Sequence, residues 1–482
     1  MDTRPRKRSL GSALLAMLLG ALAVAGCTTV GPTYKRPDVA VAPQYRSQVG
    51  PSEANSLADL PWWQVFNDKA LQELVSQALM NNYDLQITVA RIDEARAQVG
   101  IARADLYPQV GYGGTASRQK VNIPFLPLAG NVTYNSFGAI LNATWELDVW
   151  GRIRHVTDAA RANLFAQEDV RRGVMLTLVS EVAADYFVLL GLDRQLAIAR
   201  DSQDTYKRTL DLFTQRFQAG RDSRLPVMRA QAAYDSANAA IASLERAIVQ
   251  QENALSVLLG AAPGNIRRGA ALGDQVTPPQ TPTGLTTDIL KRRPDILQAE
   301  QVMIGANAEI GVAVANFFPT IGLAALFGSQ GQEPKDLVKS NFTVWGLAAN
   351  FAGPIFQGGR LKSAYEAQQA FWDESIAQYK KTILGAFQET SDALIAQQTL
   401  VTQRAALQSQ VDALRQSVDL SLQRYDGGRA SYFEVLEAEQ QLFPSEDQLA
   451  QTERDQLVAV VNLYKALGGG WNLKDTEWAQ PH

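Results

Sequence analysis

The sequence is poor in the residue types on which most enzyme and metal sites depend. Its 482 residues include a single cysteine, Cys27, and two histidines, His155 and the terminal His482. One cysteine excludes an internal disulfide, and one internal histidine argues against a Ser-His-Asp triad or a histidine-rich metal centre. A phosphate-binding loop and a dinucleotide-binding fingerprint are also missing. We therefore expect no enzyme activity, no cofactor and no metal site, and interpret His155 as a structural or interfacial residue.

Long apolar runs are equally scarce. One run of 16 residues, Leu10 to Ala25, follows a basic N-terminus; it is too short for a transmembrane helix and typical of a secretory signal peptide. No run of 18 apolar residues follows it. The run ends in VAGC at residues 24–27, which resembles the lipobox of bacterial lipoproteins. We expect Cys27 to be lipidated, with Thr28 favouring sorting to the outer membrane; the alternative is an ordinary signal peptide beside a stray cysteine.

Positive charge is not in excess. The formal net charge is −4, and removal of residues 1–26 takes away four basic residues and Asp2, which leaves −7. A negative chain is a poor partner for nucleic acid. A lipid anchor adds ~0.8 kcal/mol per buried CH₂ and tethers a protein without carrying it across the membrane. Whether the chain crosses the membrane must therefore depend on its strands.

The sequence does contain a long internal repeat, in two tandem copies. RFQAGRDSRLPVMRAQ at residues 216–231 matches RYDGGRASYFEVLEAE at residues 424–439 at an offset of 208, and upstream the offset becomes 211. A repeat of this length indicates duplication of a whole structural unit. The predicted organisation is a signal peptide (1–26), a lipidated extended segment (27–60), repeat 1 (61–260), a linker (261–282), repeat 2 (283–468) and a C-terminal tail (469–482).

Each copy is expected to hold a helical stretch, two strands and a long α-hairpin. The helical stretches, 71–106 and 289–317, end before a Pro that cannot continue a helix. Composition and short-range alternation predict strands near 109–119, 132–148, 320–329 and 340–356. Residues 155–219 and 363–426 lack proline, and the first range repeats apolar residues at coiled-coil spacing. At ~1.5 Å per residue such a helix is ~100 Å long.

Each long helix ends in a turn that predicts a hairpin. Gly220 and Gly428 suit the left-handed position that closes a helix. Ser223 and Ser431 suit the N-cap of the next helix, and Ser431 with Glu434 fits a capping box.

Four strands per chain do not close a membrane barrel, because open sheet edges are not tolerated in lipid and the smallest common barrels have eight strands. Two chains would supply eight strands and three would supply twelve. Three is preferred, since an open lumen needs more than eight strands.

Seven segments resemble the TolC-like outer membrane factor family, in particular its lipoprotein branch that serves multidrug efflux pumps. They are PWWQVFND (61–68), LVSQALMNNYDLQ (74–86), WELDVWGRI (145–153), KRRPDI (291–296), PIFQGGRL (354–361), RYDGGRASYFEVLEAEQQL (424–442) and NLYKALGGGW (462–471). The resemblance implies an α+β homotrimer with one shared 12-stranded outer-membrane β-barrel, continued by a periplasmic α-barrel of twelve helices. It also implies a periplasmic adaptor and an inner-membrane pump, often of the resistance-nodulation-division type, as partners.

The same resemblance places a periplasmic constriction in the second hairpin. Phe433 and Glu437 lie one helical turn apart on the same face, and three Glu437 side chains would form a negative ring that favours cations. The alternative is a solvated helix surface. Glu434 is a further pore candidate, although a capping box explains it equally well. The matching residues in copy one are Leu225 and Arg229, so the two hairpins differ in charge.

The turns themselves are expected to face the adaptor: Gln218, Ala219, Gly220, Arg221, Asp426, Gly427 and Gly428. Arg424, Tyr425 and Arg429 form a hypothetical tip network that locks neighbouring hairpins, with local capping as the alternative. Trp145, Trp345 and Phe342 are candidates for an interfacial aromatic belt or for helix packing. The function so predicted is a passive efflux channel. The alternatives are a non-conducting lipid-anchored scaffold or adaptor, and a channel for protein or metal-ion export.

Overall fold

The computed structural model describes residues 29–40, 42–48, 56–123, 130–275, 284, 286–470, 472–474 and 478, without the side chains of 122–131. The predicted signal peptide and Cys27 lie outside these residues. The elements in chain order are η1 (Leu57–Asp59), α2 (Trp62–Val65), α3 (Lys69–Asn81), α4 (Tyr83–Ala104), β1 (Gln109–Ile123), β2 (Gly130–Leu147), α5 (Arg152–Gln218), α6 (Arg224–Leu258), η2 (Leu272–Asp274), α7 (Ile289–Arg292), α8 (Pro294–Ala315), β3 (Thr320–Gly331), η3 (Pro334–Val338), η4 (Ser340–Phe342), β4 (Thr343–Ala352), α9 (Arg360–Asp426) and α10 (Tyr432–Ala466).

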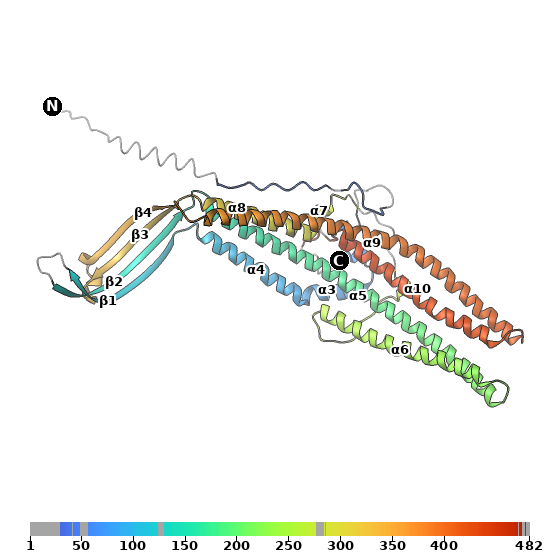
Figure 1. Cartoon of the computed structure of the whole chain (residues 1–482). Helices are drawn as coiled ribbons and strands as arrows, with labels where there is room; N and C mark the ends of the chain where they lie inside the picture. Colours follow the sequence, from blue (N-terminus) through green and yellow to red (C-terminus); the bar gives the residue numbers. More distant parts are fainter. Residues whose placement is uncertain are drawn as a thin grey trace, which may run out of the picture. The chain divides into compact units, whose positions relative to one another are not determined.

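The chain divides into two compact units. Unit 1 comprises Met1–Asp38, Arg91–Gln167 and Ala299–Tyr379, and unit 2 comprises Val39–Ala90, Glu168–Gln298 and Lys380–His482. Unit 1 contains the sheet, whose four strands lie side by side in Figure 1. Unit 2 contains α6 and α10 and the greater part of α5 and α9, which form the helical hairpins α5–α6 and α9–α10. Long helices together with a separate antiparallel sheet confirm the expected α+β class.

The tandem repeat is confirmed by the elements. Helices α5 and α9 have 67 residues each and α6 and α10 have 35 each, all offset by 208, whereas α4 and α8 have 22 each and are offset by 211. Equivalent glycines also share a left-handed backbone: Gly151 and Gly359 have φ of 83° and 86°, and Gly220 and Gly428 have φ of 69° and 66°. The bounds assigned to the six predicted segments remain predictions.

The strands form one antiparallel sheet in the order β1-β2-β3-β4. Three strands lie close to their predicted ranges. The fourth is shorter than predicted, because 3-10 turns η3 and η4 precede it and Pro354, which has no N–H to donate to a ladder, follows soon after its end. Phe342 therefore lies in η4 and not in a strand, which corrects its expected position.

The two helical stretches expected to be continuous are each broken once. Asn82 has an extended backbone and caps α4 by accepting a hydrogen bond from the N–H of Leu85 at 3.1 Å. Arg293 is extended because it precedes Pro294, which disfavours the helical conformation of the residue before it. Pro294 then opens α8 at a position where a missing N–H costs nothing.

Helix α5 buries about half of the predicted coiled-coil stripe. The buried members of that stripe are Met175, Leu178, Val182, Leu189, Ala199, Tyr206 and Phe213. A second buried set, Val179, Ala183, Phe187 and Leu190, widens the stripe. Among the described residues, α5 is also the helix whose 18-residue window is long and apolar enough to cross a membrane; 61% of that window is buried within the chain, as in a core helix.

The N-terminal segment of unit 1 is held by several contacts. A ring nitrogen of His155 lies 2.7 Å from the carbonyl oxygen of Val30, and Gly311 leaves room for this ring, since a Cβ there would lie 2.7 Å from it. Arg36 forms an ion pair with Glu300, which also accepts a hydrogen bond from the Tyr34 hydroxyl at 3.0 Å. His155 thus has a structural contact, in line with its interpretation.

Candidate functional site

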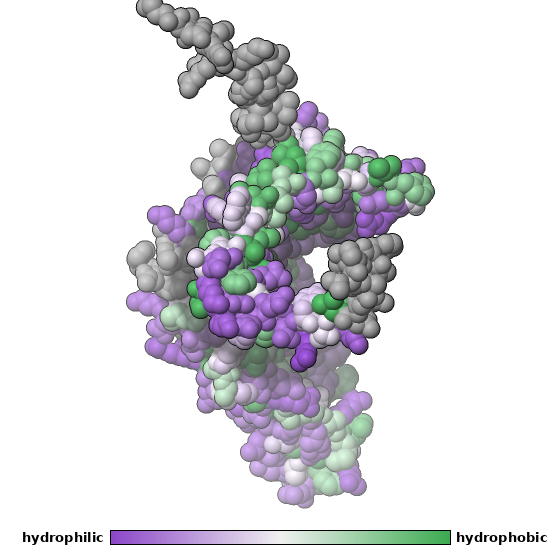
Figure 2. All heavy atoms as spheres, turned by 90° about the vertical axis from the view of Figure 1, so that its left-hand side faces the viewer, coloured by the Kyte–Doolittle hydropathy of each residue, from purple (hydrophilic) through white to green (hydrophobic). Residues whose placement is uncertain are grey.

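The sheet of unit 1 has one apolar face. Directly opposed residues share a face, and successive residues alternate between faces. The cross-strand row Tyr112, Leu141, Phe327 and Trp345 is paired across all four strands, with Tyr112 90% and Trp345 73% exposed. By the same register, the face also carries Val110, Trp145, Leu323, Leu347 and Phe351. Both tryptophans predicted to lie in an aromatic belt, Trp145 and Trp345, therefore lie on this face. Figure 2 views the molecule from the side on which Figure 1 draws the sheet, and it shows apolar residues gathered in patches.

The opposite face carries mostly small and polar side chains. Its members include Gln109, Gly111, Gly113, Thr115, Asn142, Thr144, Glu146, Gly322, Gly328 and Asn350. Two of its glycines make room for asparagines in the same way in both copies. A Cβ at Gly322 would lie 2.2 Å from Oδ1 of Asn350, and one at Gly111 would lie 3.2 Å from Oδ1 of Asn142. An apolar face backed by a small, polar face is the pattern of a barrel strand with a lipid side and a lumen side.

Two edges of this sheet are unpaired. Strands β1 and β4 each pair on one side only within the part of the chain that the structure describes. An open edge presents a row of free N–H and C=O groups, which hydrocarbon does not satisfy.

Both hairpin turns of unit 2 close their first helix as predicted. The N–H of Gly220 donates to the carbonyl of Phe217 at 2.9 Å and that of Arg221 to Arg216 at 2.9 Å. Gly428 and Arg429 repeat the pattern on Tyr425 and Arg424. This is the Schellman arrangement, which needs the left-handed glycine. The predicted adaptor-facing residues lie in these two turns: Gln218, Ala219, Gly220, Arg221, Asp426, Gly427 and Gly428.

The predicted capping box is wrong. Ser431 is at the N-cap of α10, but its side chain makes no capping hydrogen bond, and the same holds for Ser223 before α6. The carboxylate of Glu434 instead lies 3.6 Å from a guanidinium nitrogen of Arg424, in the other arm of the same hairpin. Arg424 therefore pairs locally, and Glu434 is an ion-pair partner.

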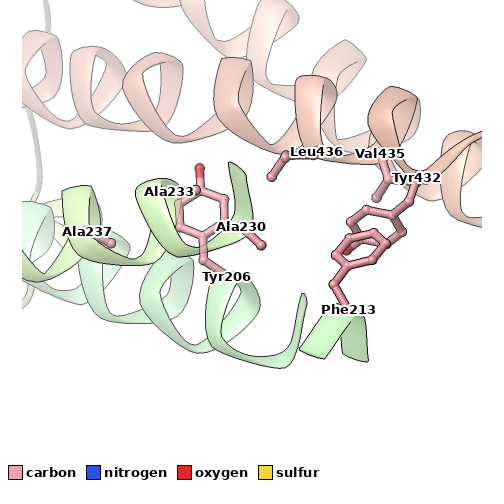
Figure 3. Packing of buried hydrophobic residues seen from close by; sticks show 8 residues of the cluster. All are labelled: Tyr206, Phe213, Ala230, Ala233, Ala237, Tyr432, Val435 and Leu436. Carbon is pink, nitrogen blue, oxygen red and sulfur yellow. The ribbon is translucent and has the colours of Figure 1, made fainter. Parts of the chain in front are cut away.

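The two hairpins pack on each other through the buried cluster of Figure 3. Tyr206 and Phe213 from α5 and three alanines from α6 meet Tyr432, Val435 and Leu436 from α10. The rings of Phe213 and Tyr432 meet edge to face, 4.8 Å apart. Small alanines let the helices approach closely, and the aromatic pair adds directional packing.

Polar contacts also join the hairpins at this cluster. The hydroxyl groups of Thr209 and Tyr432 lie 2.5 Å apart. Arg216 donates a hydrogen bond to the Tyr425 hydroxyl and stacks over the Tyr425 ring. Tyr425 therefore contacts the other hairpin of its own chain, whereas Arg424 forms its ion pair within its own hairpin.

The constriction candidates lie at the start of α10. Phe433 is 52% exposed, and Glu437 is exposed one turn further along the same helix. The guanidinium carbon of Arg229, from α6, lies 4.7 Å from the centre of the Phe433 ring. The sequence identified Arg229 as the counterpart of Glu437 but did not predict this contact, because nothing in one helix's periodicity indicates which residue of another helix faces it.

The hairpin ends carry opposite charges. We call residues 208–231 tip 1 and residues 416–439 tip 2. Tip 1 contains five arginines and two aspartates, for a net charge of +3, whereas tip 2 contains two arginines and five acidic residues, for −3. One of those acids, Glu439, is only 7% exposed, and its Oε2 has no hydrogen-bond partner among the described residues. Burial raises the pKa of Glu439 to about 7, against an opposing effect of Arg208.

Comparison with known proteins gives consistent likenesses. A sequence profile described as Outer membrane efflux protein matches residues 74–261 and 285–469. The chain is 35% identical to the toluene efflux pump outer membrane protein TtgC of Pseudomonas putida over 465 residues, 95% of this chain and 96% of TtgC. It is 33% identical to the cation efflux system protein CusC of Escherichia coli (strain K12) over 453 residues, 93% of this chain and 98% of CusC.

A third relative, the probable outer membrane lipoprotein SilC of Salmonella typhimurium, is 32% identical over 457 residues, 93% of this chain and 96% of SilC. A crystal structure of CusC, described as bearing on folding and transmembrane channel formation, superposes with a TM-score of 0.82 and 31% identity. It covers 92% of this chain and 100% of the CusC chain.

Proposed function

The chain belongs to the outer membrane efflux protein family and is an outer-membrane efflux channel; on that premise we propose that three copies form one passive conduit of a tripartite efflux system. The proposed partners are a periplasmic adaptor and an inner-membrane pump of the resistance-nodulation-division type. The observation that carries the assembly is the four-stranded sheet with two free edges and two chemically distinct faces.

The free edges call for partner chains, since in a membrane every backbone polar group must be paired. If β4 of one copy pairs with β1 of the next, three copies close twelve strands, and their small, polar faces line a lumen. Two copies would close only eight strands, whose interior side chains would fill it. A non-conducting scaffold would need neither an apolar face toward lipid nor a polar face toward a lumen.

The mass of the assembly tests this proposal. Native mass measurement of the full-length protein in detergent should give three chains, and the same species should conduct ions in a planar bilayer. A monomer or dimer that conducts would contradict the shared barrel.

We infer that the channel is lipid-anchored through Cys27 and that it imposes little choice of cargo. TtgC is named for toluene and CusC for cations, yet this chain is about as similar to one as to the other. If similar channels export such different compounds, the pump and not the channel determines which compounds are exported. We therefore propose drugs or other small molecules as cargo, moved without chemistry in the channel.

The turns Gln218 to Arg221 and Asp426 to Arg429 are proposed to dock the adaptor. Their tips carry formal charges of +3 and −3, so hairpins that alternate around a ring would present alternating charge, which favours one register of a complementary partner. A photo-crosslinking residue at position 219 or 427 should trap the adaptor in cells, whereas one at position 101, an exposed site on α4, should not. Adducts at position 101 alone would contradict this docking site.

Phe433 and Glu437 are proposed to form the resting constriction, with Glu434 held back by its ion pair to Arg424. In single-channel recordings, Phe433→Ala should raise the resting conductance, and Glu437→Gln should weaken cation preference. If both variants keep the wild-type conductance and reversal potential, the constriction lies elsewhere.

A further inference from the structure

We propose that Arg229 is a selectivity-determining residue of the constriction, which holds the Phe433 ring in place and offsets the charge of Glu437. This proposal rests on the proposed constriction at Phe433 and Glu437. It changes the expected character of that constriction from an acidic ring to a ring of both signs.

The geometry places an arginine from the first hairpin against the constriction of the second. The guanidinium carbon of Arg229 lies 4.7 Å from the centre of the Phe433 ring, within the range of a cation–π interaction. The next residue, Ala230, is fully buried in the cluster between α6 and α10. Arg229 is thus fixed beside α10 by the packing of its own helix and does not reach the ring from a mobile loop.

Within the described part of the chain, the guanidinium group of Arg229 forms no ion pair. No carboxylate within the described part of the chain lies within ion-pair distance of it, and its printed contact is with an aromatic face. Two other arginines of the tips differ, since Arg216 pairs with Asp222 and Arg424 pairs with Glu434. Among the described residues, an ion pair therefore does not offset the positive charge of Arg229 beside the ring.

The repeat shows why this charge matters. Arg229 and Glu437 occupy the same position in the two copies, 208 residues apart, and Leu225 matches Phe433. Every chain that contributes one Glu437 contributes one Arg229. Three chains would thus bring three negative and three positive charges to this level, with the Glu434 charges already paired to Arg424. The ion preference of such a ring depends on the small difference between the effects of its negative and its positive charges. Removal of the positive charges should therefore increase cation preference, and removal of the negative charges should decrease it.

Removal of the guanidinium should have two separate effects. Loss of a cation–π contact of this kind is expected to raise the fraction of time that the constriction conducts by about two- to five-fold. Loss of the charge should shift the reversal potential toward stronger cation preference. Glu437→Gln should shift the reversal potential in the opposite direction.

The experiment is single-channel recording of the full-length lipidated protein in planar bilayers under a KCl gradient. Arg229→Gln should raise the conducting fraction and shift the reversal potential toward K⁺. Arg229→Lys keeps the charge but loses the flat stacking surface, so it should preserve the reversal potential and still raise the conducting fraction. Arg246→Gln is the matched control, because Arg246 is an exposed residue of the same helix, and its hydrogen bond among the described residues is to Ser243 of that helix. In a Phe433→Leu background, Arg229→Gln should no longer change the conducting fraction.

The outcomes separate this inference from the constriction on which it rests. If Phe433→Ala raises the resting conductance but Arg229→Gln behaves like Arg246→Gln, the constriction stands and the role of Arg229 is overturned. If Phe433→Ala and Glu437→Gln leave conduction and ion preference unchanged, the constriction itself is refuted and the role of Arg229 falls with it. A rise in the conducting fraction with Arg229→Gln that persists in the Phe433→Leu background also overturns the proposal, because it would not act through the Phe433 ring.

Discussion

We predict that Glu439 makes the packing of the two hairpins depend on pH. Its carboxyl group is buried where α10 meets α5, its Oε2 has no partner among the described residues, and the Tyr206 hydroxyl donates to its backbone carbonyl rather than to the side chain. Burial raises its pKa from 4.5 to about 7, with Arg208 from α5 acting in the opposite direction and Tyr432 nearby on α10. Copy one carries the neutral Gln231 at the matching position.

The sign of the effect follows from proton binding. The packed state holds the Glu439 proton more tightly than the opened state does, so packing is most stable below pH 4.5 and weakens as the pH rises to about 7. The raised pKa corresponds to about 3 kcal/mol at pH 8, or about 100-fold in the opening equilibrium. Glu439→Gln, which mimics both the protonated acid and Gln231, should abolish this loss.

Amide hydrogen exchange provides the measurement, expressed as protection factors that remove the pH dependence of the intrinsic rates. Protection of residues 432–439 should fall by up to about 100-fold from pH 5 to pH 8 in the wild type and stay constant in Glu439→Gln. Glu437→Gln, an exposed residue of the same helix, serves as the control and should behave like the wild type. Equal protection at both pH values in the wild type would refute the reasoning, because it would mean that water reaches the Glu439 carboxyl.

Three further predictions follow from other features. Cys27→Ser should abolish incorporation of labelled palmitate, and unchanged labelling would show that the VAGC sequence is not a lipidation signal. Gly428→Ala should destabilise the second hairpin by about 1–2 kcal/mol, because φ is 66° there, whereas Gly385→Ala inside α9 should stabilise it by up to about 1 kcal/mol; thermal unfolding with shifts of the same sign would contradict this. Arg293→Ala should cost about 2 kcal/mol, since the buried Arg293 guanidinium donates a hydrogen bond to the carbonyl oxygen of Ala466 at 2.9 Å, and an unchanged melting temperature would refute it.

The architecture could be predicted from the sequence where a local residue pattern favours a single structure. Gly220 and Gly428 marked the ends of two helices because the left-handed position favours glycine. The 208-residue offset predicted hairpins of equal length, since insertions in one copy would have destroyed it. The 3-4 spacing of α5 predicted its buried stripe, because that spacing brings side chains to one helix face.

Features that depend on contacts between distant segments could not be predicted in this way. The Ser431–Glu434 pattern fits a capping box, but Arg424 from the other arm of the hairpin competes for the Glu434 carboxylate. The Arg229–Phe433 contact depends on the relative rotation of α6 and α10, which periodicity does not encode. Burial of Glu439 depends on the packing of α10 against α5, which the sequence of α10 alone does not encode, and it makes Glu439 one of the least exposed acids among the described residues.

Accessibility of the two sheet faces tests the central claim, a conducting barrel lined by the small, polar face, most directly. Asn350 and Phe351 are adjacent in β4 and lie on opposite faces by the strand register. Lipidation would leave Cys27 without a free thiol, so a cysteine introduced at either position would be the reactive one. In planar-bilayer recordings of the full-length protein, a water-soluble charged thiol reagent should lower the unitary current of Asn350→Cys stepwise and leave Phe351→Cys unchanged. If the folded protein opens no channels, or if the reagent blocks Phe351→Cys alone, the account is contradicted.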